Sequence, residues 1–254
     1  MSIKDDIITG MQKFFIPHKL QLGDITHLSD SDSELVISQN ILEIEDLIEV
    51  ETYEKIFIGQ ITDITTGSVE IEIVEEKGER TNKIKPSVTI VQSISNDSKF
   101  NYFLEKSVEI GLGRITPIES KYSLKNKNKA LKNYGLWNKI VKDATDQSRN
   151  PYPPVLDKPI KIKELEKQDF KDSINICLAT ENVNPIFLDE YLKQKDTNQN
   201  FVIAIGPEKG WSSSDIDVFQ KLNFDFIKLR GNILRTETAG LVIGSIVKYI
   251  KGEI

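Results

Sequence analysis

The sequence is poor in the residues that metal and covalent chemistry most often use. Its 254 residues include one cysteine and two histidines. A single cysteine excludes a disulfide scaffold and a metal site built from cysteines. His18 and His27 both lie in the N-terminal part, far in sequence from the turns discussed below. We therefore expect no metal site and no nucleophile–base pair, and an enzyme of this composition would act by binding and orientation.

Long hydrophobic runs are also missing. No apolar segment approaches the roughly 20 residues that a membrane-spanning helix needs, and the sequence starts without a signal-peptide pattern. The one cysteine, Cys177, stands in an apolar segment typical of a buried strand, and we interpret it as a small core residue. These absences predict a protein of the reducing cytoplasm with no membrane partner.

Acidic and basic residues are unevenly distributed along the chain. The formal net charge is −6, which by itself argues against a nucleic-acid partner. However, residues 1–80 hold 18 Asp and Glu against 6 Lys and Arg, whereas residues 81–254 hold 21 against 27. The segment 121–142 has no acidic residue and seven lysines, namely Lys121, Lys125, Lys127, Lys129, Lys132, Lys139 and Lys142. This cluster is typical of a phosphate-binding surface, but a solvated lysine-rich helix has the same pattern, and both interpretations stay open.

Residues 1–78 have the pattern of a small β domain. Apolar and polar residues alternate with period two, or form short apolar runs, in four segments: Leu35–Ile37, Ile48–Tyr53, Lys55–Ile61 and Ser68–Ile73. Short strands at such close spacing predict a small barrel. The polar residues 79–86 predict a linker and place the domain boundary there.

Residues 87–254 alternate between strand and helix patterns. Asn96 is in position to cap a helix, and a later helix is predicted with Leu136, Ile140, Val141 and Ala144 on one face. This alternation predicts an α/β domain with a mainly parallel sheet covered by helices.

Two strand-to-helix turns stand out in the last quarter of the chain. One apolar run, Phe201–Ile205, ends at Gly206-Pro207-Glu208-Lys209-Gly210, and Ser212 can cap the helix that follows. A second run, Phe224–Leu229, leads through Ile233-Leu234-Arg235-Thr236-Glu237-Thr238 into another helix. Ligands of open α/β sheets bind outside the carboxyl ends of the strands, so these turns are the first candidate site.

The residues in these turns support binding more than covalent chemistry. Gly206 and Gly210 allow the backbone to approach a ligand closely, although an ordinary turn would use them equally well. Thr236 or Thr238 can cap the second helix, and Glu237 favours its positive end. An unpaired charge between a strand end and a helix is costly, so we expect Arg235 to pair with a carboxylate or to bind substrate.

Taken together, the two motifs resemble a known family. Ile205–Trp211 and Ile233–Ala239 are similar to the two signature loops of the RsmE family, the 16S ribosomal RNA uridine-N3 methyltransferases of the SPOUT superfamily. Further matches are Lys106–Gly111, Ile115–Pro117 and Asp146–Ser148. The similarity extends from about Val88 to the C-terminus.

The resemblance implies a fold, a cofactor and a partner. It implies an N-terminal PUA-like β-barrel, a C-terminal α/β domain tied in a trefoil knot, and a homodimer formed around the knot. The cofactor would be S-adenosylmethionine and the partner 16S rRNA or the small ribosomal subunit. The implied cofactor pocket comprises Leu178, Ala179, Ile205, Gly206, Pro207, Glu208, Lys209, Gly210, Leu229, Ile233, Leu234, Arg235, Thr236, Thr238 and Ala239.

The resemblance also implies roles for individual side chains. Arg235 would orient the uracil carbonyls or stabilise the developing anion. Glu208 or Glu237 would accept the proton, unless their roles are structural. Arg149 would contact RNA.

Some positions depart from the family pattern. Lys209 and Arg230 stand where the family usually has glycine, and Asn232 stands where it usually has arginine. Two alternatives follow from these departures and from the acidic first domain. One is a divergent SPOUT-like protein that binds cofactor or RNA without turnover, and the other is a methyltransferase that acts on a different RNA.

Overall fold

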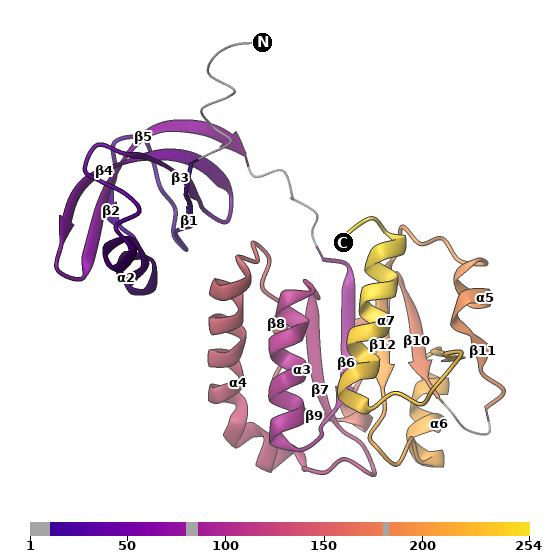
Figure 1. The fold of residues 1–254 in the computed structure, drawn as a ribbon. Coiled ribbons are helices and arrows are strands. Elements are labelled where there is room, and N and C mark those ends of the chain that lie inside the picture. Colours follow the sequence, from indigo (N-terminus) through magenta and orange to yellow (C-terminus); the bar gives the residue numbers. More distant parts are fainter. Residues whose placement is uncertain (1–10, 80–85, 180–182) are drawn as a thin grey trace. The chain divides into compact units, whose positions relative to one another are not determined.

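The computed structural model describes residues 11–79, 86–179 and 183–254. Most of the predicted linker, 79–86, lies outside the described residues. The chain divides into two compact units, residues 1–83 and 84–254 (Figure 1). No helix in the described ranges combines the length and the apolar character that a membrane crossing requires.

The first unit is built on a five-stranded sheet. In sequence order its described elements are β1 (Lys13–Phe15), β2 (Ile25–His27), α2 (Asp30–Gln39), β3 (Leu47–Glu51), β4 (Lys55–Thr65) and β5 (Ser68–Glu79). The strand order is β1-β3-β4-β5-β2, so the described sheet is open, with β1 and β2 at its edges. Alternate residues such as Val69, Ile71 and Ile73 are fully buried in the core of this unit, as period-two patterning requires.

One predicted strand of this unit is wrong. Leu35–Ile37 lies inside helix α2, where only Val36 of the three is buried. The helix has an N-cap at Ser29, whose side chain accepts a hydrogen bond from the backbone N–H of Asp32. The three apolar residues alone did not indicate this helix. The β character expected for the rest of the unit is present in β3, β4 and β5.

The second unit contains an eight-stranded sheet, and every strand pair described in it is parallel. The predicted α/β fold with a parallel sheet is therefore confirmed. The strand order is β11-β13-β10-β12-β6-β7-β8, and β9 also pairs with β7. Their bounds are β6 (Val88–Ser93), β7 (Arg114–Glu119), β8 (Val155–Leu156), β9 (Ile160–Lys161), β10 (Ser173–Leu178), β11 (Ile186–Phe187), β12 (Asn200–Ile205) and β13 (Asp225–Lys228).

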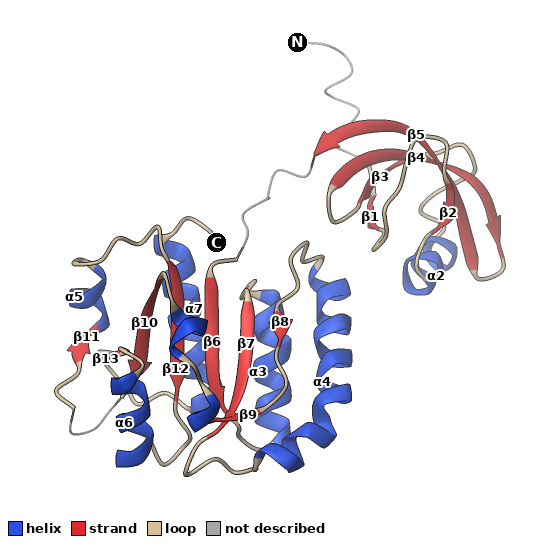
Figure 2. Ribbon diagram, turned by 180° about the vertical axis from the view of Figure 1, so that it is seen from behind, coloured by secondary structure: helices blue, strands red, loops and turns tan. Residues whose placement is uncertain are grey.

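Helices cover both faces of this sheet (Figures 1 and 2). They are α3 (Asp97–Glu109), α4 (Lys127–Ser148), α5 (Leu188–Leu192), α6 (Ser213–Lys221) and α7 (Thr236–Ile250), with the 3-10 turns η2 (Ile162–Glu164) and η3 (Lys167–Phe170). Strand β12 divides its side chains between two cores: Phe201, Ile203 and Ile205 pack with α3, α4 and α7, whereas Val202 and Ala204 pack with α6. Cys177 is fully buried in the second core, and burial raises the pKa of its thiol.

Two helix predictions, one of a cap and one of a buried face, can be compared with the structure. Asn96 caps α3 as expected, because its side chain accepts from the backbone N–H of Lys99 at 3.0 Å. The predicted face of α4 is partly wrong, since Leu136 is half exposed while Trp137 is buried. Trp137 packs on Phe100 of α3 with ring centroids 4.4 Å apart, which turns the helix so that Leu136 faces solvent.

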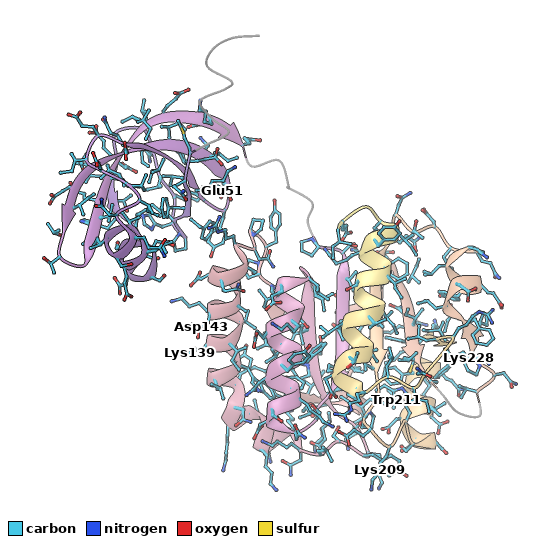
Figure 3. The ribbon with its side chains drawn as sticks, in the orientation of Figure 1. Glu51, Lys139, Asp143, Lys209, Trp211 and Lys228 are labelled. Atoms are coloured by element: carbon cyan, nitrogen blue, oxygen red, sulfur yellow. The ribbon has the colours of Figure 1, made fainter. Side chains whose placement is uncertain are left out.

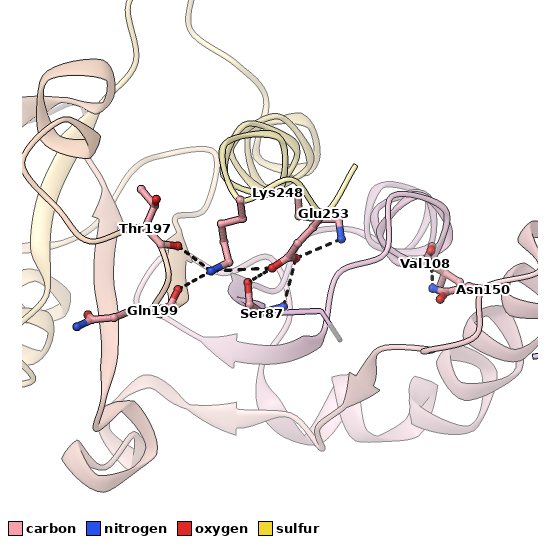
Figure 4. A network of polar contacts seen from close by, with 8 residues as sticks. Ser87, Val108, Asn150, Thr197, Gln199, Lys248 and Glu253 are labelled. Carbon is pink, nitrogen blue, oxygen red and sulfur yellow. Dashed lines mark hydrogen bonds and ion pairs between the residues drawn. The ribbon is translucent and has the colours of Figure 1, made fainter. Parts of the chain in front are cut away.

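A buried polar network joins the two ends of the second unit (Figure 4). The Glu253 carboxylate accepts hydrogen bonds from the hydroxyl of Ser87 at 2.5 Å and from the ammonium of Lys248 at 3.4 Å. Lys251 lies 4.0 Å from the same carboxylate and donates to the carbonyls of Thr197 and Gln199. Side-chain exposures of 4–8% show that the two ammonium groups and the carboxylate are buried together, and backbone carbonyls supply the further partners of Lys251.

Candidate functional site

A pocket of about 430 Å³ lies at the carboxyl edge of the parallel sheet. It forms where β10 and β12 end and where α7 begins. Twelve of the fifteen residues predicted for a cofactor pocket line it: Leu178, Ala179, Ile205, Gly206, Pro207, Glu208, Gly210, Ile233, Leu234, Arg235, Thr236 and Ala239. The structure thus brings the two sequence motifs together around one cavity.

Two hydrogen bonds fasten the loops of the pocket to each other. The hydroxyl of Thr236 donates to the carbonyl of Gly206 at 2.9 Å, which joins the two motifs. The indole N–H of Trp211 donates to the carbonyl of Leu178 at 2.9 Å, which joins the first loop to the end of β10. Trp211 also lies against Gly206, where an added Cβ would stand 3.1 Å from the indole ring. Glycine is required there because the aromatic ring occupies the space of a side chain.

The start of α7 differs from the predicted cap. Arg235 occupies the N-cap position and its side chain makes no capping bond. The hydroxyl of Thr236 is used for Gly206 instead, and Thr238 does not line the pocket. Glu237 is buried in the first turn, and one of its carboxylate oxygens has no hydrogen-bond partner among the described residues. The helix start is therefore held by the bond from Thr236 to the opposite loop rather than by a side-chain cap.

The loop after β12 is held from its far side as well. Ser212 and Asp215 form the capping box of α6, as their spacing predicts. The buried carboxylate of Asp215 also accepts from the backbone N–H of Lys121 at 3.3 Å. This bond holds the loop after β7, where the lysine-rich segment begins, beside the pocket loop.

Arg235 is exposed where it lines the pocket. No hydrogen bond or ion pair with another residue of the described ranges is present for its guanidinium. The expected carboxylate partner is thus absent from this part of the chain, and solvent exposure removes the cost of leaving the charge unpaired. The guanidinium is free to bind a ligand at the pocket.

Lys209 does not disturb the pocket that surrounds it. Its side chain is exposed, does not line the cavity and lies at the lower rim of the second unit in Figure 3. Within the loop the positive φ that favours glycine, 75°, belongs to Gly210. A lysine at position 209 is therefore compatible with the loop conformation.

Leu229 lines a separate apolar groove. The groove has a volume of about 810 Å³ and lies between α5 and α7. Its walls include Leu229, Arg230, Asn232, Leu234 and Ile246. Leu234 lines both the pocket and the groove, so the second motif separates them.

Arg230 belongs to the rim of this groove rather than to the pocket. Its guanidinium donates to Asp189 at 3.2 Å and to Glu190 at 2.5 Å. It also stacks over the ring of Phe187, 3.8 Å from the centroid. The arginine at this position therefore has its own structural partners.

Arg149 lies far from the pocket within this chain. It is the C-cap of α4, whose N-terminus follows the carboxyl end of β7. A helix of 22 residues is about 33 Å long, so Arg149 lies toward the opposite edge of the sheet (Figure 1). Its predicted RNA contact stays a prediction. Of the lysine-rich segment, Lys129, Lys132, Lys139 and Lys142 are exposed on α4.

Sequence reasoning missed three residues that line the pocket: Lys99, Trp211 and Ile216. Trp211 is the last residue of the first motif, and its indole N–H is a donor that a buried position must satisfy. That signal could have identified it. Lys99 gave no such signal, because it lies in the first turn of α3, more than one hundred residues before the first motif.

Comparisons with known proteins agree with this arrangement. Residues 82–248 match the family model of the RNA methyltransferase domain. Ribosomal RNA small subunit methyltransferase E of Mesomycoplasma hyopneumoniae is 31% identical over 190 residues, which cover 74% of this chain and 79% of that protein. The protein of the same name from Aquifex aeolicus is 29% identical over 201 residues, which cover 76% and 81%.

A solved structure shows the same fold. The ribosomal RNA small subunit methyltransferase E of Neisseria gonorrhoeae, bound to S-adenosyl methionine, superimposes with a TM-score of 0.69 at 23% identity. The match covers 94% of this chain and 98% of that one. The resemblance found in the two motifs is confirmed, and the chain belongs to the RNA methyltransferase family, among the ribosomal RNA small subunit methyltransferase E proteins.

Proposed function

We propose that the protein transfers a methyl group from S-adenosylmethionine to N3 of a uridine in 16S ribosomal RNA. The observation that carries this proposal is the joining of the two family motifs around one pocket, with the Arg235 guanidinium available in its lining. A member of the same family has been solved with this cofactor, which supports the choice of methyl donor.

The residues of the pocket fit this cofactor. The volume falls in the range of small-molecule sites. Apolar walls from Leu178, Ile205 and Ala239 suit a nucleobase, and the exposed carboxylate of Glu208 suits a cationic group. The positive end of α7 suits a carboxylate. When bound, the cofactor would supply a methyl carbon activated by the adjacent sulfonium, with the neutral thioether S-adenosylhomocysteine as the leaving group.

The residues of the chain would align the base and stabilise charge. Uracil N3 becomes nucleophilic as it loses its proton, and negative charge then spreads onto the neighbouring carbonyl oxygens. Arg235 is placed to donate hydrogen bonds to such oxygens, which stabilises this charge in a site partly screened from water. We propose Glu237 as a proton acceptor or as the anchor of the α7 start, since its carboxylate is buried and incompletely bonded.

The RNA would reach the pocket as an unpaired or flipped nucleotide. Uracil N3 lies inside the Watson–Crick pair, so the base must leave the helix for methylation. The exposed lysines of α4 and Arg149 are proposed contacts for the RNA backbone. The solvated-helix interpretation of these lysines stays open beside this one.

The alternative of a binding protein without turnover loses much of its motivation. It is based on Lys209, on Arg230 and on the divergent, acidic first unit. Neither of the two side chains lines the pocket, whereas the character of the first unit is unchanged as an argument for it. A methyltransferase with a different RNA target remains compatible with the acidic first unit. Both alternatives are outcomes of the deletion experiment described below.

The proposal extends to the architecture of the whole protein. We propose that residues 1–78 form a PUA-like barrel and that residues 87–254 form the methyltransferase domain, with a trefoil knot around the two motifs. The site of action would be the cytoplasm, on the small ribosomal subunit. A homodimer would cover the apolar groove between α5 and α7, which adjoins the pocket through Leu234.

The dimer gives a direct test. Changing Ile246 to aspartate places a charge inside the groove, and a buried unpaired charge costs several kcal/mol. We expect analytical ultracentrifugation to show a dimer for the wild type and a monomer for Ile246→Asp. Tyr249→Asp is the control, because Tyr249 is 74% exposed and lies outside the groove. A wild-type monomer at micromolar concentration contradicts the dimer.

The reaction is tested in the host. We expect 16S RNA from a strain that lacks this gene to lose one 3-methyluridine by mass spectrometry, and the purified protein to restore it on subunits from that strain. An unchanged 16S profile with a loss in another RNA would favour the different-target alternative. Cofactor binding with no change in any RNA would favour the protein without turnover.

A further inference from the structure

An ion pair crosses one wall of the pocket. The ammonium of Lys99, in the first turn of α3, contacts the carboxylate of Glu208 on the loop after β12. Both residues line the cavity. The backbone N–H of Lys99 donates to the side chain of Asn96, the helix cap, at 3.0 Å. The cation is therefore attached to a fixed helix end, whereas the anion stands on a glycine-bounded loop.

The other residues of that loop are fixed by burial and by hydrogen bonds at its two ends. Pro207 is buried, the N–H of Gly210 donates to the carbonyl of Pro207 at 2.9 Å, and Trp211 is fixed beneath. Glu208 and Lys209, at the tip of the loop, are exposed. Among the described contacts, the ion pair of Glu208 with Lys99 is the one that ties these two side chains to another element. The ion pair thus fixes where the Glu208 carboxylate stands.

The charges matter more for the ligand than for stability. The side chains are 24% and 43% exposed, and partly exposed ion pairs stabilise a fold only slightly. A sulfonium cofactor is different, because its positive charge would lie in the pocket whose wall carries both groups. A lysine without its carboxylate partner would repel that charge, and a carboxylate without its lysine would attract it.

We propose that Lys99 is a positioning residue that pairs with Glu208 and so sets the charge of the cofactor pocket for a sulfonium ligand. This inference rests on the proposed function, since it takes the sulfonium cofactor from it. It predicts that the ion pair controls the ratio of the affinities for S-adenosylmethionine and S-adenosylhomocysteine. The two ligands share every polar group, but the product lacks the sulfonium charge.

Calorimetric titration with both ligands tests the proposal. In Glu208→Gln the lysine is unpaired, and we expect S-adenosylmethionine affinity to fall roughly tenfold while S-adenosylhomocysteine affinity falls about twofold or less. In Lys99→Met the preference should shift toward S-adenosylmethionine. The double variant Lys99→Met/Glu208→Gln should return the affinity ratio to the wild-type value, because both charges are gone.

The control is a lysine on the same helix. Lys106 pairs with Glu105 and Glu109 within α3 and does not line the pocket, so Lys106→Met should leave the ratio unchanged. An equal loss of both ligands in Glu208→Gln, or a double variant that keeps the altered ratio, would overturn the proposal. If the wild type binds neither ligand, the proposed function fails; if it binds both and the ratio never moves, only this inference fails.

Discussion

Replacing Arg235 with alanine lowers the rate of RNA methylation by roughly two to three orders of magnitude, the usual loss when one donor to a developing oxyanion is removed. The side chain is exposed and makes no hydrogen bond or ion pair with another described residue, so the free energy of unfolding should hardly change. Affinity for S-adenosylmethionine should also stay within a few-fold. The measurement is single-turnover methylation of small subunits from the deletion strain, beside calorimetry with the cofactor.

Arg114 provides the matched control for Arg235. It is also an exposed arginine, but it lies at the start of β7 and pairs with Asp157 through two hydrogen bonds of 2.8 and 2.9 Å. Arg114→Ala should therefore cost a little stability and leave the methylation rate near that of the wild type. A rate for Arg235→Ala within a few-fold of the wild type would remove Arg235 from the chemistry.

Replacing Trp211 with alanine destabilises the second unit by about 3–5 kcal/mol, the range for deleting a large buried aromatic side chain. The indole is 5% exposed and packs edge-on against Phe219, with ring centroids 4.8 Å apart. Its loss also leaves the carbonyl of Leu178 without the indole donor. Urea unfolding should show the loss of stability, and cofactor affinity should fall because the loops of the pocket lose a shared support.

A more conservative variant separates the effect of the buried ring volume from the effect of the hydrogen bond to Leu178. Trp211→Phe keeps most of the ring volume but removes the hydrogen bond to Leu178, which we expect to cost about 1–3 kcal/mol. Trp137→Phe is the control, since Trp137 is equally buried but its indole N–H has no partner among the described residues. Cofactor affinity should fall in the first variant and not in the second. Equal affinities in both would show that this hydrogen bond does not shape the pocket.

Much of the pocket could be predicted because its residues are contiguous. Gly206–Gly210 and Ile233–Ala239 follow apolar strands, and parallel strands place their carboxyl ends at one edge of the sheet. The sequence could not show that Leu229 points into the neighbouring groove, because the side of the chain on which a residue lies at a strand end depends on the local bend. The motifs thus located the site more reliably than the individual side chains.

Other parts depend on contacts that sequence patterns do not encode. Lys99 reaches the pocket only because α3 packs beside the loop of Glu208. The three apolar residues Leu35–Ile37 fit a strand as well as one helical turn, and the cap at Ser29 decides the outcome. The cap of α7 was misassigned for a similar reason, since Thr236 bonds to a carbonyl thirty residues away. For Lys99 and Thr236 a tertiary contact overrides the local pattern, whereas for Leu35–Ile37 a local cap decides it.

The network around Glu253 has a mechanical consequence. Any pull that reaches the second unit through residue 86 arrives at Ser87, which is bonded to the buried carboxylate of Glu253 and, through it, to Lys248 of α7. Strand β6 lies between β12 and β7 in parallel register, so a pull directed along β6 would load its hydrogen bonds to both neighbours together. The candidate pocket lies at the other edge of the sheet, where β10 and β12 end. The network therefore anchors the start of β6 at the edge of the sheet that lies away from the loops of the pocket.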